Sequence, residues 1–428
     1  MIPIYQYDEI ASSDIFLRGM TGPDVRETVA DIIKNVRLNG DAAILEYARK
    51  FDRAELSETG IEVSREEIDR AYASVDPDLL RILARAAENI RAFHANQVRQ
   101  GFEIRRPDGV VMGQKITPIE KVALYIPGGT AAYPSTVLMN AIPAKLAGSR
   151  EIVMVSPPTA GGTIAAPILA AAKLAGVDRV FRVGGAQAVA ALAYGTQTVP
   201  RVDKIVGPGN AFVAEAKRQI YGDVAIDMIA GPSEILVIAD GKSNPPHVAA
   251  DLLRQAEHDR MATAVLVTDS QPLAEAVQAE LERQLQLLPR QEIARASIEN
   301  NGKIIVTRDL KLAAEASNRL APEHLEIMTE NPMDYLPLIE NAGSIFLGRY
   351  CPEALGDYMA GPNHTLPTSG TARFSSPLSV DDFVKKTQYT YFTKDALADL
   401  SRDVAAFARV EGLEAHARSA LAREEEIR

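Results

Sequence analysis

The stretch Lys121-Val-Ala-Leu-Tyr-Ile-Pro-Gly-Gly decides the fold, because an apolar run of strand length ends there in a glycine loop. Similar short runs recur with helical patterns between them, and they begin at Glu151, Arg179, Lys204 and Glu234. Buried apolar strands that alternate with helices are typical of a parallel sheet covered by helices on both faces. We therefore predict an α/β domain that begins near residue 121.

A second series of apolar runs predicts a second α/β domain. Its strands are Thr263-Ala-Val-Leu-Val-Thr, Lys303-Ile-Ile-Val and Ser344-Ile-Phe-Leu. Residues 24–100 show helical spacing without strands of their own, so we expect these N-terminal helices to pack with the second series. The last stretch, from Asp395 onward, is typical of a charged amphipathic helix and predicts a helical C-terminal tail.

Composition favours a protein that handles small molecules. At 428 residues the chain exceeds the size at which a single core keeps growing, so roughly two to three domains are expected. A formal net charge of -11 argues against nucleic acid as a partner, because that needs a clustered basic excess. The sequence has neither a secretory signal at its start nor an apolar run near the ~20 residues of a membrane span. We predict a cytoplasmic protein, and its single cysteine, Cys351, agrees with a reducing compartment.

Three glycine loops follow strands of the first series: Ile126-Pro-Gly-Gly-Thr, Val183-Gly-Gly-Ala-Gln and Val206-Gly-Pro-Gly-Asn. Ligands of open parallel sheets bind at the carboxyl ends of the strands, so a nucleotide site is one interpretation. None of the loops has the G-x-G-x-x-G spacing or the lysine of a P-loop, and tight turns explain each of them as well. Tyr125 could stack on a cofactor or hydrogen-bond it, and Asn210 could begin a helix and hold a ribose or phosphate, but both could be structural.

Four of the six histidines lie near a carboxylate or a carboxamide in the C-terminal half of the chain. These groups are Gln255-x-x-His258, Glu323-His324, Asp357 with His364, and Glu411 with His416. Imidazole, carboxylate and amide oxygen are ligands of catalytic Zn²⁺ or Mn²⁺, whereas structural zinc prefers thiolates. One cysteine cannot form a thiolate cage, so the pattern predicts one metal-dependent active site assembled from distant segments.

Spacing leaves the role of each residue open. Gln255 and His258 share one face of the helical stretch 251–258 and could bind one ion, but His258 could equally cap the end of that helix. Asp357 is expected in a loop or at a helix start, where capping is the alternative role.

Two pairs impose conditions on the structure. Glu323 and His324 would face opposite sides of a regular strand, so both reach one pocket only if the turn at Pro322 breaks the alternation. Such a pair can take one proton from an alcohol and another from an attacking water. Glu411 and His416 lie about 140° apart on a regular helix, so a shared site requires a helix that begins after Glu411 or inserts deeply. That terminal helix could serve a neighbouring subunit or could simply be solvated.

Eight motifs occur together in this order: Tyr125-Ile-Pro-Gly-Gly, Val206-Gly-Pro-Gly-Asn, Ala230-Gly-Pro-Ser-Glu, Gln255-Ala-Glu-His, Ala321-Pro-Glu-His-Leu, Gly356-Asp-Tyr, Gly361-Pro-Asn-His-Thr-Leu-Pro-Thr and Glu411-Gly-Leu-Glu-Ala-His. Through them the chain resembles the histidinol dehydrogenase family over nearly its whole length. Members of that family are homodimeric zinc enzymes that oxidise L-histidinol to L-histidine through the aldehyde, using two NAD⁺ in turn.

The resemblance implies a role for each candidate residue. The zinc ligands would be Gln255, His258, Asp357 and His416, with His416 supplied by the partner subunit. The acid/base pair would be Glu323 and His324, in which His324 takes the alcohol proton and Glu323 activates water. The substrate contacts would be Ser233, Gln255, His258, His324, Asp357, His364, Glu411 and His416. The NAD⁺ contacts would be Tyr125, Gln187 and Asn210.

The resemblance also implies a domain plan of two incomplete Rossmann-like, doubly wound domains. Residues 1–22 would form an N-terminal arm. Residues 23–120 with 236–378 would form a discontinuous metal and catalytic domain, and residues 121–235 an NAD-binding domain. Residues 379–428 would form a helical tail that is exchanged in a homodimer, so that each active site is completed by the partner subunit.

Three alternatives stay open. A related metal-dependent NAD alcohol dehydrogenase could act on another substrate, such as a sulfonated diol, although Glu411 favours a substrate with an amine. A zinc hydrolase could use Glu323 to activate water, but the strand-end glycine loops speak against it. A metal or nucleotide sensor would retain its function without Glu323.

Overall fold

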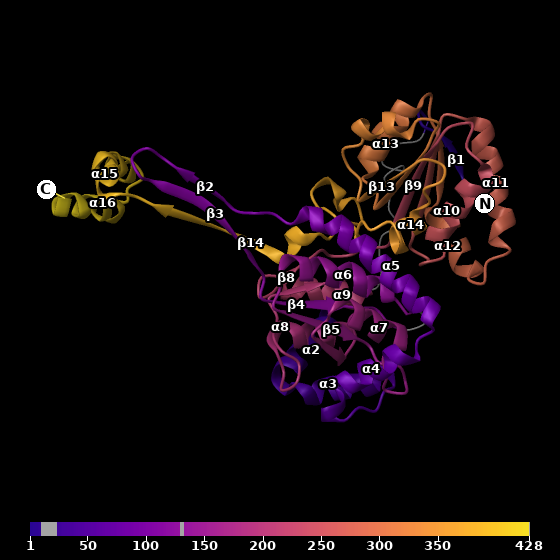
Figure 1. The fold of residues 1–428 in the computed structure, drawn as a ribbon. Helices are drawn as coiled ribbons and strands as arrows, with labels where there is room; N and C mark the ends of the chain where they lie inside the picture. The colour runs from indigo at the N-terminus through magenta and orange to yellow at the C-terminus, as the bar shows by residue number, and fades with distance from the viewer. Residues whose placement is uncertain (10–23, 129–131, 428) are drawn as a thin grey trace. The chain divides into compact units, whose positions relative to one another are not determined.

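The computed structural model describes residues 1–9, 24–128 and 132–427. The chain divides into two units, drawn in Figure 1. The first unit comprises Met1–Gln97 and Ile119–Phe383, and the second comprises Val98–Pro118 and Val384–Arg428. Most of the predicted N-terminal arm, residues 10–22, lies outside the described residues, as do positions 129 and 130 of the first glycine loop.

A five-stranded parallel sheet in the first unit confirms the first α/β series. Its order is β6-β5-β4-β7-β8. The strands are β4 (Lys121–Tyr125), β5 (Glu151–Ser156), β6 (Arg179–Arg182), β7 (Lys204–Val206) and β8 (Ala225–Ile226). Successive side chains of a strand point to opposite faces, so Val122 and Leu124 join one core while Ala123 and Tyr125 join the other. The sheet is therefore buried on both faces.

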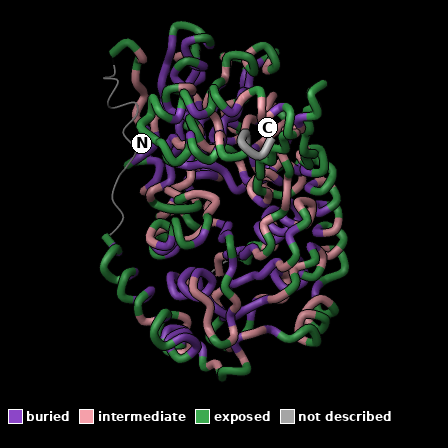
Figure 2. The backbone as a smooth tube through the Cα atoms, turned by 90° about the vertical axis from the view of Figure 1, so that its left-hand side faces the viewer, coloured by how far each residue is buried: buried purple, intermediate pink, exposed green. Residues whose placement is uncertain are grey.

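Helices cover the two faces of this sheet, and the N-terminal helices are among them. One face carries α4 (Arg65–Ser74), α5 (Pro77–His94), α6 (Pro134–Ala147) and α7 (Ala166–Ala175). The other carries α2 (Arg26–Asn39), α3 (Asp41–Tyr47), α8 (Gly185–Tyr194) and α9 (Ala211–Ile220). Buried positions are purple in Figure 2.

This packing corrects the expectation that residues 23–120 belong with 236–378. In α2 the buried residues Val29, Ile32, Ile33 and Val36 recur at helical spacing, and they contact the same core as Ala123. Each such side chain contributes about 1.5–3 kcal/mol when buried. The spacing revealed which face of the helix is apolar, but it did not reveal which sheet that face covers.

A six-stranded parallel sheet, also in the first unit, confirms the second α/β series. Its order is β1-β11-β10-β9-β12-β13. The strands are β1 (Ile4–Gln6), β9 (Glu234–Ala239), β10 (Thr263–Thr268), β11 (Lys303–Val306), β12 (His324–Met328) and β13 (Ser344–Leu347). The helices are α10 (Pro245–Ala256), α11 (Gln271–Leu285), α12 (Gln291–Asn301), α13 (Leu310–Leu320) and α14 (Glu353–Tyr358).

Strand β1 lies outside the range predicted for this sheet, and strand β9 crosses the start of that range. Strand β1 comes from the predicted N-terminal arm and pairs with β11. Strand β9 begins at Glu234, which the sequence analysis placed in the first domain, but it pairs with β10 and β12. Apolar strands of both sheets look alike in sequence, so the boundary between the two series was not marked by residue type.

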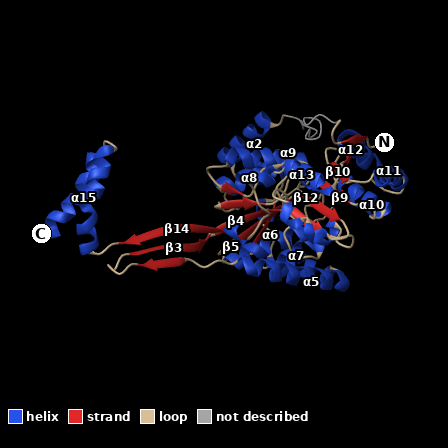
Figure 3. Cartoon of the chain, turned by 90° about the horizontal axis from the view of Figure 1, so that it is seen from above, coloured by secondary structure: helices blue, strands red, loops and turns tan. Residues whose placement is uncertain are grey.

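The second unit contains a three-stranded antiparallel sheet and two helices. The strands are β2 (Phe102–Arg105), β3 (Val111–Pro118) and β14 (Val384–Tyr391), in the order β14-β3-β2. Figure 3 shows β3 and β14 side by side, with α15 (Lys394–Val410) beyond them, and α16 (Glu414–Ile427) follows. The predicted tail is thus helical only from residue 394, after a strand. Among the described residues, none of the helices is long and apolar enough to cross a membrane.

Candidate active site

Glu323 and His324 meet at the backbone of Glu234, the first residue of β9. The Glu323 Oε2 atom accepts the Glu234 N–H at 2.8 Å, and His324 Nδ1 lies 2.9 Å from the Glu234 carbonyl oxygen, to which it donates. Their side chains come within 3.5 Å of each other. Because α13 ends at Ala321 in a left-handed conformation and β12 begins only at His324, Glu323 precedes the regular strand. The condition that both residues reach one place is confirmed.

The surroundings move both groups away from their ordinary pKa values. Burial raises the pKa of the Glu323 carboxyl to about 7, although the neighbouring His324 opposes the shift. Burial disfavours a charged imidazole at His324, but the carboxylates of Glu353 and Glu323 outweigh it and raise the pKa of His324 to about 10. Glu323 can therefore exchange a proton near neutral pH, whereas His324 stays protonated beside Glu353.

Glu353 is the partner that the sequence analysis missed. It is buried at the start of α14, and one of its oxygens forms an ion pair with His324 Nε2 at 2.8 Å. Its backbone N–H donates to Glu326 at 2.8 Å, which fixes the start of α14 against β12. Glu353 lies far from every histidine that it contacts along the chain, so no local spacing pairs it with His324.

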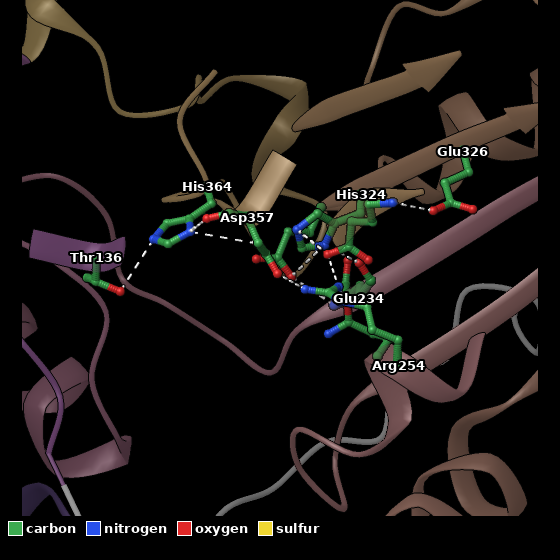
Figure 4. A network of polar contacts seen from close by, with 10 residues as sticks. Thr136, Glu234, Arg254, His324, Glu326, Asp357 and His364 are labelled. Carbon is green, nitrogen blue, oxygen red and sulfur yellow. Dashed lines mark hydrogen bonds and ion pairs between the residues drawn. The ribbon is translucent and has the colours of Figure 1, made fainter. Parts of the chain in front are cut away.

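A guanidinium lies among the oxygen atoms of this cluster. Arg254, from the last turn of α10, forms ion pairs with Glu353 and Asp357 and donates to the Gln255 side-chain oxygen at 3.2 Å (Figure 4). These carboxylates raise the pKa of Arg254 despite its burial. Arg254 directly precedes the motif Gln255-Ala-Glu-His, and this position beside a motif is the signal in the sequence that points to it.

His324, Glu353 and Asp357 offer ligand atoms within 4.8 Å of one another, a grouping that could hold a metal ion. Only Asp357 belongs to the predicted ligand set. Both ring nitrogens of His324 have partners within the protein.

Gln255 and His258 lie where α10 ends. Gln255 is buried in the last helical turn, and the helix finishes at Ala256, so His258 follows the helix rather than belonging to it. Its backbone N–H donates to the Gln255 carbonyl oxygen at 3.2 Å. The His258 ring keeps an exposed surface, but the surrounding protein and the charge of Arg254 lower its pKa. A neutral imidazole is the form that binds a metal.

Asp357 and His364 come together, but not as the sequence analysis expected. Asp357 lies in the last turn of α14, neither in a loop nor at a helix start. His364 Nδ1 lies 3.1 Å from the Asp357 carbonyl oxygen and 3.7 Å from its Oδ1, while Nε2 contacts the Thr136 hydroxyl at 3.3 Å. Burial lowers the pKa of His364. Ser233 directly precedes Glu234, whose backbone bonds to both Glu323 and His324.

Glu411 and His416 belong to the second unit, whereas the other predicted site residues belong to the first. Glu411 ends α15, Gly412 has a φ of +77°, and α16 begins at Glu414. The chain therefore turns between Glu411 and His416, which removes the separation of about 140° that one continuous helix would impose.

A pocket of about 640 Å³ follows the strands of the five-stranded sheet. It is lined by all three predicted cofactor residues: Tyr125 at the end of β4, Gln187 in α8, and Asn210 before α9. The Tyr125 hydroxyl accepts the Gly185 N–H at 3.0 Å, and burial raises the pKa of Tyr125 to about 12. Asn210 Oδ1 accepts the N–H groups of Phe212 and Val213, so it begins α9 as predicted.

A buried ion pair fixes one glycine loop of this pocket. Lys217 pairs with Asp227 and donates to the Gly207 carbonyl oxygen at 3.0 Å, while Asp227 accepts the Gly207 N–H at 2.7 Å. Gly207 has a φ of +112°, and a Cβ there would lie 2.2 Å from the Tyr125 carbonyl oxygen. The loop that carries Asn210 therefore requires glycine and is held at both backbone groups.

Comparisons with known proteins agree with this geometry. A family model described as histidinol dehydrogenase matches residues 18–424. Histidinol dehydrogenase of Geobacter sulfurreducens is 56% identical over 400 residues, covering 93% of each chain. That of Clostridium acetobutylicum is 54% identical over 402 residues, covering 94% of this chain and 93% of the relative. The crystal structure of histidinol dehydrogenase from Elizabethkingia anophelis is similar with a TM-score of 0.94 and 38% identity, covering 100% of this chain and 98% of that one.

The match spans both sheets of the first unit and the second unit, and it contains every motif that suggested the resemblance. On these grounds the chain belongs to the histidinol dehydrogenase family of oxidoreductases.

Proposed function

We propose that this chain is a zinc-dependent, NAD⁺-linked enzyme that oxidises L-histidinol to L-histidine through L-histidinaldehyde, the final steps of histidine biosynthesis. The observation that carries the proposal is the buried Glu323–His324 pair beside a cluster of oxygen and nitrogen donors. Relatives over nearly the whole chain bear the name of the corresponding enzyme, which supports the choice of substrate. A cytoplasmic location remains a prediction.

The donors near the pair fit a divalent metal. Gln255 offers an amide oxygen, Asp357 a carboxylate and His258 a neutral imidazole, and the guanidinium of Arg254 lies among the first two. A position that holds a guanidinium already favours positive charge. We assign zinc to Gln255, His258, Asp357 and His416, although Mn²⁺ accepts the same ligands. Bound there, the ion would hold the substrate's imidazole and amine and polarise its oxygen.

In the first oxidation, His324 accepts the proton of the substrate hydroxyl as the C–H bond gives a hydride to NAD⁺. For this its Nε2 must first give up the proton that it shares with Glu353, which that carboxylate can take, and turn its lone pair to the hydroxyl, while the Nδ1 bond to Glu234 keeps the ring oriented. In the second, Glu323 takes a proton from the water that adds to the aldehyde. His324 returns its proton to the carbonyl oxygen as the water adds. The hydrate then gives a second hydride to a second NAD⁺ and a hydroxyl proton to His324, which leaves the carboxylic acid.

The remaining candidates would contact substrate. His364 is fixed by Asp357 and Thr136, so its ring is already oriented. Ser233 lies one residue before Glu234, the residue that binds both members of the acid/base pair. Glu411 supplies a carboxylate for the substrate's amine.

We assign NAD⁺ to the pocket lined by Tyr125, Gln187 and Asn210. The first turns of α8 and α9 begin at this pocket, and helix N-termini favour anionic groups such as phosphates. Bound there, the nicotinamide would accept the hydride.

A homodimer would complete the site, because Glu411 and His416 lie in the second unit. On α15, Phe407 and Val410 are 69% and 84% exposed, and Val404 is also exposed. A row of exposed apolar side chains on one helix is typical of a surface that another chain covers. We propose that this tail is exchanged and that His416 reaches the site of the partner subunit.

The test of the reaction is the NADH formed per L-histidinol consumed, measured on zinc-loaded protein with a chelated control. Two NADH per substrate, lost on chelation and regained with zinc, is the expected result. A folded, metal-loaded protein that does not oxidise histidinol would contradict the proposal and would favour an enzyme of another alcohol.

The test of the exchange is a mixture of Glu323→Gln and His416→Ala subunits, each inactive alone. One site of a mixed dimer would then contain neither change, so part of the activity should return. Verified mixed dimers without activity would place His416 in its own subunit's site.

A further inference from the structure

One carboxylate of the proposed cofactor pocket has no assigned role. Asp52 lines this pocket together with Phe51, Tyr125, Gln187 and Asn210. Its Oδ2 atom is buried and makes no hydrogen bond with any residue that the structure describes. Burial raises the pKa of the Asp52 carboxyl to about 6, and its charge also helps to raise the pKa of Tyr125. An ionised, unsatisfied carboxylate is costly unless a ligand supplies hydrogen-bond donors.

The backbone holds Asp52 in this position. Residues Ala48–Asp52 form a π-helical turn, a geometry often found at functional sites, and the chain leaves it through Arg53 with a φ of +55°. The Phe51 ring stacks on Tyr47 at 5.4 Å, which anchors the turn. A non-glycine residue in the left-handed region costs free energy, so surrounding structure must maintain it.

The rest of the pocket indicates which donors Asp52 would meet. Phosphates would be met by the helix N-termini at Gly185 and Asn210, and the apolar walls include Ile32 and Phe51. Among the described lining residues there is neither lysine nor arginine. A dinucleotide brings ribose hydroxyls as donors, whereas a 2′-phosphorylated one replaces a donor by a group of the same sign as Asp52.

We propose that Asp52 binds ribose hydroxyls of the dinucleotide and makes the enzyme select NAD⁺ over NADP⁺. This inference rests on the proposed NAD⁺ site. It differs from that proposal because the pocket could bind a dinucleotide without Asp52 determining which one. A repulsive element of this kind gives specificity without new attraction to the preferred ligand.

The test compares cofactor binding by wild type, Asp52→Ala and Asp52→Asn. Affinities for NADH and NADPH are read from the fluorescence of the bound cofactor, which is simple here because the chain has no tryptophan. Asp52→Ala should weaken NADH binding by about 10- to 100-fold, the loss of hydrogen bonds to a charged acceptor. Asp52→Asn should reduce the preference for NADH over NADPH by about tenfold or more, mainly by admitting NADPH. The same shift should appear in kcat/KM for NAD⁺ and NADP⁺.

Stability distinguishes a binding role from a structural one. An unpartnered carboxylate that serves a ligand destabilises the ligand-free protein. Asp52→Asn should therefore raise the thermal midpoint of the free protein and lower its affinity for NADH. A structural role predicts a lower midpoint. Glu55→Gln is the matched control, because Glu55 is exposed three residues further and pairs loosely with Arg49 at 3.7 Å; it should change neither value.

Two outcomes would overturn the inference, and only the second would also refute the proposed function. Folded Asp52 variants with wild-type preference, in an enzyme that still reduces NAD⁺ with histidinol, would refute the role of Asp52 alone. A wild type that binds neither NADH nor NADPH would refute the pocket and the proposed function with it. If Asp52→Ala fails to fold, the isosteric Asn variant decides.

Discussion

The two candidate sites of the first unit both contain buried ion pairs, but those pairs have different neighbours. In the pocket on the five-stranded sheet, Lys217, Asp227 and Tyr125 bond to backbone groups of the glycine loops. In the cluster on the six-stranded sheet, His324, Glu353 and Arg254 face one another as opposite charges. Groups tied to the backbone keep a shape, whereas charges tied to one another can exchange partners and protons. The first site is suited to holding a ligand and the second to chemistry.

The largest expected effect is at the charged cluster. Glu323→Gln removes the base that activates water, so kcat should fall by about 10²–10⁴-fold, the usual contribution of general acid/base catalysis. Folding should persist, because the amide oxygen can still accept the Glu234 N–H. Steady-state NADH formation measures the loss, and Glu330→Gln, on an exposed carboxylate, serves as control. Near-normal turnover in the variant would show that another base activates the water.

At the pocket, the corresponding substitution is Lys217→Met, which removes one member of a buried ion pair. Both members of the Lys217–Asp227 pair are buried, so removing one should destabilise the protein by about 3–5 kcal/mol, measured by urea unfolding. The double variant with Asp227→Asn should recover part of that loss, since no unpaired charge remains. Lys242→Met, in an exposed pair with Glu330, should cost less than about 1 kcal/mol. Equal losses of stability in the Lys217 and Lys242 variants would contradict a role of Lys217 in holding the glycine loop.

The pH dependence should also distinguish the two sites. With a pKa of about 7, Glu323 loses its basic form as pH falls, so the aldehyde-to-acid step should slow about tenfold per unit below pH 7. An ordinary glutamate would stay ionised down to about its reference pKa of 4.3. NADH affinity should stay constant through pH 7 and fall only below about pH 6, where the Asp52 carboxyl takes up a proton. A rate that stays flat down to pH 5 would show that Glu323 is not the base.

The raised pKa of Glu323 also makes the stability of the protein depend on pH. Between the ordinary pKa of 4.5 and about 7, folded Glu323 binds a proton that the unfolded chain releases. Its contribution to stability therefore falls as pH rises through this window. Wild type should lose stability relative to Glu323→Gln across the window, as measured by thermal or urea unfolding at several pH values.

The smallest effect concerns Asn210. Asn210→Ala removes the cap of α9 and should cost about 0.5–2 kcal/mol of stability. Asn210→Ser should restore the cap. If Asn210 also contacts the cofactor, the serine variant recovers stability but not the KM for NAD⁺. Recovery of both would reduce Asn210 to a structural role.

The sequence predicted what its local patterns encode. Apolar strands and helical spacing are local, so both parallel sheets, the helical start of α9 and the helices from 394 onward were predicted. Glu323 and His324 were paired correctly because their chemistry and the turn at Pro322 are adjacent in sequence.

The rest depends on packing between distant segments. An apolar face on α2 does not specify its sheet, and β1 is too short to be recognised as a strand. Glu353 reaches His324 only after β12 and α14 have packed, so no spacing rule could have paired them. The end of α10 before His258 depends on one or two residues, at the limit of what propensity can resolve.

The division of the candidate residues between two units also has a genetic meaning. If each site combines Glu323 of one copy with His416 of another, damaging alleles fall into two groups according to the unit that they affect. A cell that carries one allele of each group could grow without histidine, although neither allele suffices alone. Two alleles of the same group should not rescue each other. Growth of such paired strains would map the boundary between the units, near residues 98–118 and 384, without any structure.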